Sequence, residues 1–498
     1  MGAWRPSYWR WQIAEPFGGI EALAGELNTT PLVAQILYNR GIADAQAAKA
    51  FLNPKLSDLH DPADLPGALP AAERIAQAVA GGHKIVIYGD YDVDGMTGVA
   101  ILHSILRMVG AEVAYYVPHR LDEGYGVNSE AVGKLIGEGM RLLITVDCGI
   151  SAVEPVAEAT AAGVDVIVTD HHTPGDRLPD ALAIVHPAIA GPEPQYPNAK
   201  LAGAGIAFKL AWQVARAICG ENRLDEAMRA FLLDATCLAA LGTIADMVPL
   251  VGDNRVLATY GLRGLPATKH EGLRALLKSA SLTGEKLDGH HVGFELGPRL
   301  NACGRMGHAR QAVELLTGAS AARCGEIAEY LARQNTERQK IDRDVTAQAI
   351  KMVEVRGLDS SDHRAIVVGC QDWHGGVIGI VASRLVERFA RPAIVVAFNG
   401  DHGGQGSGRS IPGFHMLEAL AACAEHLETF GGHAMAGGLR IPPGRFDAFT
   451  EQFLRYAGEN ITADQLKPVL HIDAEATLSQ LSYNVVRCLT QMAPFGQG

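Results

Sequence analysis

Residues Ile85-Val86-Ile87 lead into Asp90-Tyr91-Asp92-Val93-Asp94-Gly95, and this stretch decides the fold. Short β-branched runs separated by helical patterns predict buried parallel strands, and ligands of such sheets gather at the carboxyl ends of the strands. The pattern therefore predicts an α/β protein with a doubly wound parallel sheet and a metal-dependent hydrolytic site at one edge. Two later apolar segments end in the same way, Leu142–Val146 in Asp147-Cys148-Gly149 and Val166–Thr169 in Asp170-His171-His172.

The bulk composition is typical of a soluble enzyme with several cores. The chain has 498 residues, of which 48% are hydrophobic and 20% charged, which indicates more than two folding units. Its eight cysteines form no C-x-x-C pair, which favours reduced thiols. We see neither a signal peptide nor a run near the ~18 apolar residues of a membrane span, so we expect a cytoplasmic protein without membrane contact.

The net charge of −12 would ordinarily argue against a nucleic-acid partner. Part of this excess acid lies in the predicted site, where bound divalent cations would reverse the local field. Arginine-containing motifs lie elsewhere in the chain. The global charge therefore does not exclude DNA.

The order of predicted elements gives five regions. We expect an N-terminal helical segment at 1–79, a catalytic α/β domain at 80–320, one long exposed helix at 321–355, a second α/β domain at 356–460 and a new unit from 467 to 498. Asn128 and the capping-box spacing of Ser151-Ala152-Val153-Glu154 each predict a helix start in the first domain. Gly-rich loops are expected in the second domain at Trp373–Gly379, Gly403–Gly408 and Gly431–Gly438.

The alternation of Asp90, Asp92 and Asp94 predicts one carboxylate-bearing face if the segment is extended, with neighbours about 6.6 Å apart. Such carboxylates can bracket two cations about 3.5–4 Å apart, as in two-metal phosphoesterases. Asp246 is a further acid in an otherwise apolar stretch, where a metal would explain it. Carboxylate and imidazole ligands without thiolate favour Mn²⁺, with Mg²⁺ or Co²⁺ as alternatives.

Other interpretations of these residues stay open at this point. Acids after a strand are commonly turn or cap residues. The segment from Asp92 to Thr97 also resembles the D-x-D-G-T signature of haloacid-dehalogenase phosphatases, in which Asp92 would be a nucleophile. That fold does not require Asp170-His171-His172, and three strands that end alike favour the metal site.

The four acidic motifs resemble those of the DHH phosphoesterase family, which is named after a segment like Asp170-His171-His172. Gly242–Asp246 with Met247–Leu250 resembles its fourth motif. The resemblance implies that His172 lies beside the scissile phosphate, with Asp90 and Asp170 as orienting residues. It implies five metal ligands: Asp92, Asp94, Asp147, His171 and Asp246. Tyr88 departs from the pattern, because smaller DHH phosphatases carry a histidine ligand there.

Further motifs resemble the single-strand-specific 5′→3′ exonucleases of this family over nearly the whole chain. Leu296–Met306 is similar to a signature of their catalytic core, which implies that Arg299, Asn301 and Arg305 face DNA. Gly406–Ser410 and Gly431–Gly438, the latter with His433 as a DNA-contacting residue, resemble the associated DHHA1 domain. A guanidinium grips phosphate bidentately, so Ser407 and Arg409, with Arg120, are expected to hold a 5′-phosphate.

The resemblance implies hydrolysis of single-stranded DNA to 5′-mononucleotides in repair and recombination, with two divalent cations, Mn²⁺ before Mg²⁺. It implies a single-strand-binding protein and a RecQ-type helicase as partners. Pro468–Gly498 looks like the beginning of an OB-fold. Two rivals remain: a DHH oligonucleotidase or phosphatase acting on short nucleotides, and a non-catalytic replication scaffold of the Cdc45 type.

Overall fold

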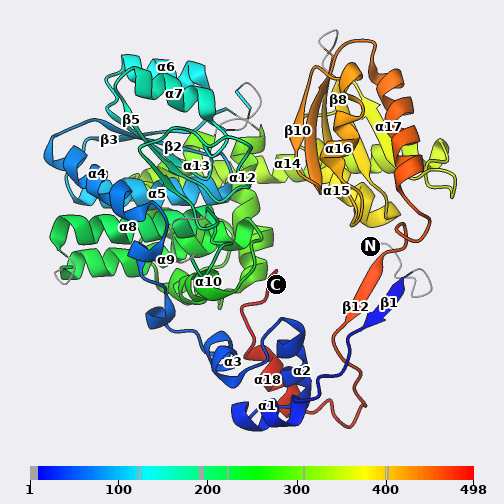
Figure 1. Cartoon of the computed structure of the whole chain (residues 1–498), viewed down its shortest axis with the longest axis horizontal. Helices are drawn as coiled ribbons and strands as arrows, with labels where there is room; N and C mark the ends of the chain where they lie inside the picture. The colour runs from blue at the N-terminus through cyan, green and yellow to red at the C-terminus, as the bar shows by residue number, and fades with distance from the viewer. Residues whose placement is uncertain are drawn as a thin grey trace. The chain divides into compact units, whose positions relative to one another are not determined.

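The chain folds into two compact units that each combine segments far apart in the sequence (Figure 1). The computed structural model describes residues 9–119, 123–124, 126–189, 196–220, 224–306, 309–398, 400 and 403–497. One unit, here the catalytic unit, comprises Pro16–Asn335 and Ala476–Gly498. The other, the second unit, comprises Met1–Glu15 and Thr336–Glu475. The backbone therefore passes between the units at three points.

A five-stranded parallel sheet forms the centre of the catalytic unit, in the order β3-β2-β4-β5-β6. Its side chains alternate between two cores, because successive residues of a strand point to opposite faces. Ile85 and Ile87 enter one core with α5 and α8, whereas Val86 and Tyr88 enter the other with α6 and α7. The predicted doubly wound sheet is confirmed. Its strands are β2 (Ile85–Gly89), β3 (Val113–Tyr116), β4 (Leu142–Val146), β5 (Asp165–Thr169) and β6 (Ala183–Val185).

Helices of the catalytic unit cover both faces of this sheet and extend one side of it. They are α4 (Ala68–Ala80), α5 (Val93–Met108), α6 (Ser129–Gly137), α7 (Val153–Ala161), α8 (Gly203–Cys219), α9 (Glu226–Ala245), α10 (Gly252–Gly264), α11 (Glu271–Ser279), the π-helical turn η5 (His291–Leu296), α12 (Gly297–Met306) and α13 (Ala309–Leu316). Asn128 caps α6 by accepting a hydrogen bond from the Ala131 amide, as predicted. The predicted capping box does not form, because α7 begins after Ala152 without a side-chain cap.

The N-terminal helices pack with the C-terminal helix in a separate small core. Leu37 and Ala48 lie in it together with Cys488 and Met492. The helices are α1 (Ile20–Leu27), α2 (Pro31–Asn39), α3 (Ala45–Leu52) and α18 (Tyr483–Thr490). Figure 1 shows α18 in red among the blue N-terminal helices. The sequence did not predict that the two ends of the described chain pack together.

Helix α14 (Ala321–Val355) is the predicted long helix, and the division between the two units falls within it. The second unit has a five-stranded sheet in the order β10-β11-β9-β8-β7, in which only β7 and β8 are parallel. Its elements are β7 (Ile366–Cys370), α15 (Ile378–Phe389), β8 (Ala393–Phe398), β9 (Gly404–Arg409), α16 (Met416–Ala421), β10 (Thr429–Gly432), β11 (Ala436–Ile441) and α17 (Phe446–Asn460).

Two segments predicted as Gly-rich loops are strands of this sheet. Residues 404–409 form β9, and residues 431–438 span the β10–β11 hairpin. A Cβ on Gly406 would lie 2.8 Å from the side chain of Leu439, and one on Gly408 would lie 2.8 Å from that of Met416. The glycines therefore permit close packing within a sheet.

A two-stranded parallel ladder joins β1 (Arg10–Ile13) to β12 (Val469–Ile472). The segment expected to begin an OB-fold thus supplies strand β12 to this ladder and helix α18 to the catalytic unit. The OB-fold itself stays a prediction.

Helix α9 is the one helix among the described residues that is long and apolar enough to cross a membrane by length and composition. Its most apolar 18-residue window is 61% buried within the protein. A core helix passes the same test, and α9 packs against α10, α5 and α8.

Candidate metal centre

The acidic and histidine motifs follow three strands that are neighbours in the sheet, β2, β4 and β5. The expected extended arrangement of the first motif is wrong, because α5 begins at Val93. Asp92 caps this helix by accepting a hydrogen bond of 3.0 Å from the Gly95 amide, and Asp94 lies in its first turn. The helix start still brings the acids to the same edge of the sheet.

Three groups of potential ligands lie at this edge of the sheet, and two of them contain Asp147. Ligand atoms of Asp90, Asp92 and Asp147 all lie within 4.8 Å of one another. The same holds for Asp94, His171 and Asp246, and for Asp147 with both histidines. Asp90, predicted as an orienting residue, is thus placed as a potential ligand, and Asp147 lies where it can bridge two ions.

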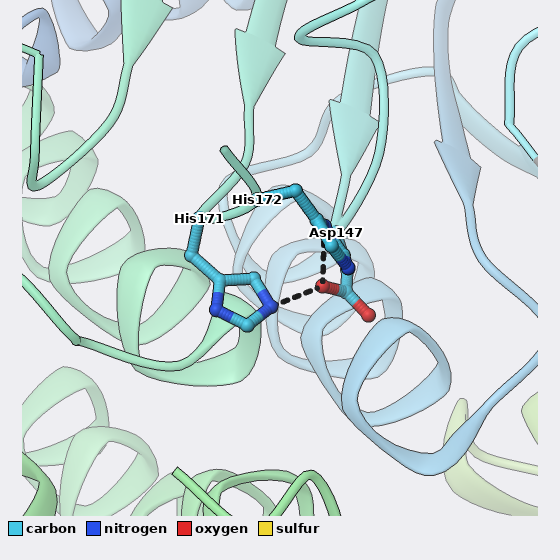
Figure 2. Close-up of side chains that lie close together, drawn as sticks. All are labelled: Asp147, His171 and His172. Carbon is cyan, nitrogen blue, oxygen red and sulfur yellow. Dashed lines mark ion pairs between the residues drawn. The ribbon is translucent and has the colours of Figure 1, made fainter. Parts of the chain in front are cut away.

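His171 connects the group of Asp94, His171 and Asp246 to Asp147, and Figure 2 shows its ring beside the Asp147 carboxylate. Its Nε2 atom lies 3.0 Å from Asp147 Oδ1, 3.6 Å from Asp246 Oδ2 and 3.8 Å from Asp94 Oδ2. One imidazole nitrogen facing three carboxylates is the arrangement expected around a cation.

Backbone amides at the start of α8 hold Asp94 in place. Its two oxygens accept hydrogen bonds from Gly203 N at 2.6 Å and Ala204 N at 2.9 Å. A helix N-terminus favours negative charge, so α8 stabilises this buried carboxylate. A Cβ on Gly203 would lie 2.8 Å from Asp147 Oδ1, and one on Gly242 would lie 2.4 Å from Asp94 Oδ1.

Sequence reasoning missed Gly203 as a site residue and assigned no role to Gly242. The small-residue run Leu201-Ala202-Gly203-Ala204-Gly205 is the available signal, since such runs permit close backbone approach.

Two residues of the site have left-handed backbone conformations. Asp147 has φ 60° and Met247, directly after Asp246, has φ 61°. Non-glycine residues seldom adopt this region, and such strain tends to occur at functional sites. Asp147 is held by its amide, which donates to Thr169 O at 3.0 Å, so its position depends on the adjacent strand end.

Asp170 lies against His172, and its orienting role stays a prediction. His172 Nδ1 lies 2.8 Å from Asp170 Oδ1, and the Asp170 carboxylate also accepts from the amides of Ile150 at 2.9 Å and His171 at 2.8 Å.

His186 is a positioning residue that sequence reasoning missed. Its Nδ1 atom accepts from Ala188 N, so its Nε2–H donates to His172 O at 2.9 Å. His186 lies directly after β6, and a histidine at the end of a strand is the sequence signal that could have identified it.

Three carboxyl groups of the site, those of Asp94, Asp147 and Asp246, have raised pKa values. Burial, followed by repulsion from Asp92, raises the pKa of Asp94 to about 7. Burial and repulsion from Asp94 raise the pKa of Asp246 to about 8, and the same causes raise the pKa of Asp147 well above its ordinary value. So many acids facing one another fit divalent cations, which would neutralise them.

The two histidines have opposite protonation. Burial lowers the pKa of His171 to about 4, with repulsion from His172 as a further cause, so it is neutral and available as a ligand. Burial also lowers the pKa of His172, but the hydrogen bond and charge of Asp170 outweigh it and raise that pKa to about 9. In the metal-free site His172 therefore holds its proton at neutral pH, and its N–H is suited to contact a phosphate oxygen.

Tyr88 takes no part in the metal centre. It is fully buried in the core on the opposite face, where its hydroxyl donates to Gly126 O at 3.1 Å and accepts from Asn128 Nδ2. Cys148 is buried on the same face and packs in the same core. The position of Asp90 offers a ligand in place of the missing histidine.

Helix α12 carries the predicted DNA-facing residues beside the first acidic motif. A Cβ on Gly304 would lie 2.9 Å from Tyr91 O, so the two segments are in close contact. Arg299, Asn301 and Arg305 are half-buried, and Arg299 donates to Glu295 O at 2.6 Å. Their contact with DNA stays a prediction.

In the second unit, Ser407 and Arg409 lie together on β9. Arg409 Nη1 donates to Ser407 Oγ at 3.1 Å, and a Cβ on Gly379 would lie 3.1 Å from that oxygen and 3.2 Å from Arg409 Nη2. The pair thus faces the first turn of α15, where amides favour an anion. His433 is exposed after β10, and Arg120 lies outside the described residues.

Comparisons with known proteins agree with this architecture. Residues 84–240 match the DHH family N-terminal domain, and residues 362–459 match the DHHA1 domain. Single-stranded-DNA-specific exonuclease RecJ of Bacillus subtilis is 42% identical over 98% of this chain, which spans 60% of that relative. RecJ of Dickeya dadantii is 38% identical over 94% of the chain and 82% of the relative.

A crystal structure of Thermus thermophilus RecJ with Mn²⁺ matches 99% of this chain and 68% of its own, with a TM-score of 0.83 and 32% identity. The same Thermus protein in complex with Mg²⁺ gives a TM-score of 0.77 at 30% identity, over 99% of this chain and 67% of its own. The shared fold and the identity to relatives over most of their length leave one assignment: the chain belongs to the RecJ family, a branch of the DHH proteins.

Proposed function

We propose that the chain is a metal-dependent exonuclease that degrades single-stranded DNA from the 5′ end and releases 5′-mononucleotides. The observation that carries this proposal is that two ligand groups, Asp90 with Asp92 and Asp147, and Asp94 with His171 and Asp246, meet where His171 lies 3.0 Å from Asp147. Together they supply five carboxylates and one neutral imidazole. The names of the RecJ relatives support single-stranded DNA as the substrate. A scaffold that had lost its ligands would not retain this set.

The residues fit two divalent cations, Mn²⁺ or Mg²⁺, because all donors are carboxylate oxygens or imidazole nitrogen. Bound there, such ions would lower the pKa of a coordinated water and neutralise charge on the phosphate. The cationic His172 would donate a hydrogen bond to a non-bridging phosphate oxygen as negative charge develops. Asp170 holds that imidazole in one orientation.

We further propose that Ser407 and Arg409 bind the terminal 5′-phosphate. The hydroxyl, the guanidinium and the first turn of α15 supply donors around one point. This would select the 5′ end. The proposal also places the enzyme in the cytoplasm with a single-strand-binding protein and a RecQ-type helicase as partners, which co-purification from the source cells would test.

The deciding experiment is a time course with Mn²⁺ on a 5′-phosphorylated single strand and on a blunt duplex. We expect mononucleotides from the 5′ end of the single strand only. Asp147→Ala should abolish their release, whereas Glu158→Ala, which removes an exposed carboxylate on α7, should not. Turnover of dinucleotides without cleavage of long strands would instead identify an oligonucleotidase.

A further inference from the structure

Phe294 presents an aromatic ring to solvent on a turn of π-helix. Its side chain is 71% exposed, although it lies in η5, directly before the arginine-bearing helix α12. The ring is stacked on His290, with centroids 4.8 Å apart and planes inclined by 27°. Exposing a large apolar ring in a fixed orientation has a cost, and π-helical turns are frequent at functional sites.

This stacked pair lies close to the metal centre. Helix α9 ends in Ile244 and Ala245, directly before the ligand Asp246. A Cβ on Gly297 would lie 3.5 Å from that of Ala245, and one on Gly289 would lie 4.0 Å from Ile244 Cγ2. The residues on both sides of η5 therefore touch the helix end that carries a metal ligand.

His290 also lines an open cavity of about 1250 Å³ within the catalytic unit. Phe495, 62% exposed, forms part of the same wall. Four exposed basic residues stand around the cavity: Lys49, Lys55, Arg263 and Lys286. None of them forms an ion pair with a residue that the structure describes. In a chain of net charge −12, this concentration of unneutralised cations is unusual.

The two acids of the cavity are occupied by local hydrogen bonds. Asp58 accepts from Lys55 N at 2.8 Å. Asp288 accepts from His290 N at 3.0 Å and lies 2.6 Å from His291 Nδ1. Both acids are exposed, like the four basic side chains, but the basic residues outnumber them by four to two.

We propose that the Phe294–His290 pair and the basic cavity beside it form a binding track for single-stranded DNA outside the metal centre. One nucleobase stacks on the free face of Phe294, and the following phosphates lie along the four cations. Stacking requires an unpaired base, because a duplex hides its base faces, so the track adds selectivity for single strands. The inference rests on the proposed function and names a surface that serves it.

The test measures binding and turnover separately. A 5′-phosphorylated strand with phosphorothioate linkages resists hydrolysis, and 2-aminopurine at successive positions reports stacking by loss of fluorescence. With wild-type protein and Mn²⁺, we expect one position to be quenched. Phe294→Ala should remove this quenching and weaken binding about 5- to 100-fold, whereas Phe294→Trp should retain both. Tyr483→Ala, at a ring that is 86% exposed on α18, is the matched control.

The contribution of the four basic residues around the cavity is measured separately. Lys286→Ala and Arg263→Ala should each reduce the slope of log affinity against log salt by about 0.7, the single-strand value for one phosphate contact. The control Tyr483→Ala should keep both the slope and the release of mononucleotides at the wild-type level.

Equal affinity and equal quenching in Phe294→Ala and the control would overturn the proposal. The proposal would also be overturned if these residues bound a folded protein in preference to the single strand. If the wild type binds and quenches the resistant strand but releases no nucleotide from an ordinary one, the proposed function fails while the track stands.

Discussion

Replacing Arg255 by methionine should release the C-terminal segment from the catalytic unit. Arg255 lies on α10 and is only 3% exposed. It donates to Phe51 O at 2.5 Å, Met492 O at 2.7 Å and Pro494 O at 3.2 Å, and its guanidinium lies 3.5 Å from the centroid of the Phe51 ring. Burial lowers its pKa to about 10, so it stays charged at neutral pH.

The expected loss of stability follows from these contacts. A hydrogen bond to a charged group contributes about 1.5–3 kcal/mol, and an unsatisfied buried carbonyl costs about 1–3 kcal/mol. The bonds, four with the one to Ala493 O at 3.3 Å, share one side chain and are not additive, so we expect a loss of about 3–5 kcal/mol in the free energy of local opening. Since 1.4 kcal/mol is a factor of ten, the segment should open at least a hundredfold more often.

Hydrogen exchange read by mass spectrometry would measure this opening. The informative amide is Leu250 N, which donates to Gln497 O at 2.9 Å and should lose protection together with residues 484–497. Arg263→Met changes an exposed arginine on the same helix and should leave the segment protected. Unchanged exchange in Arg255→Met would refute the idea that this side chain holds the segment.

Three further predictions concern the metal centre. Asp90→Asn should lower Mn²⁺ affinity at least tenfold in isothermal titration calorimetry if Asp90 is a ligand, and an unchanged affinity would return it to an orienting role. The raised pKa values of Asp94 and Asp246, about 7 and about 8, mean that the stability these two groups contribute to the metal-free fold is fully present below about pH 4 and is lost as pH rises through 7–8. Thermal shift should therefore show Mn²⁺ raising Tm more at pH 8 than at pH 6, and an equal rise would contradict these values. Gly242→Ala places a Cβ 2.4 Å from a carboxylate oxygen and should abolish Mn²⁺ binding, whereas Gly133→Ala, on α6 with nothing within 4 Å, should keep it and stabilise the helix by about 1 kcal/mol.

The sequence was sufficient to predict the sheet and most of the site, because one chemical pattern repeats after three strands. Three strands ending in acids or histidines fixed the sheet edge, because carboxyl ends of neighbouring parallel strands meet there. Asp92, Asp94, Asp147, His171 and Asp246 lie together as expected. The position of Asp90 could not be predicted, because it depends on whether the chain after β2 stays extended or enters a helix.

Other features depend on contacts between distant residues and leave no local signal. The backbone amides of α8 that hold Asp94 are more than a hundred residues away, and main-chain donors have no sequence signature. The Gly-rich stretches of the second unit suggested turns because glycine commonly marks them. Here the absence of a side chain serves packing against Leu439 and Met416 instead.

The three backbone passages between the units have a consequence for limited proteolysis. One passage lies near Glu15, one within α14 and one near Glu475. A protease that cuts any single passage leaves the units joined by the other two. After cuts in α14 and near Glu475, the four-residue ladder of β1 with β12 would still tie the N-terminal fragment to the second unit. A nicked sample should therefore migrate as one particle under native conditions and as fragments only after denaturation.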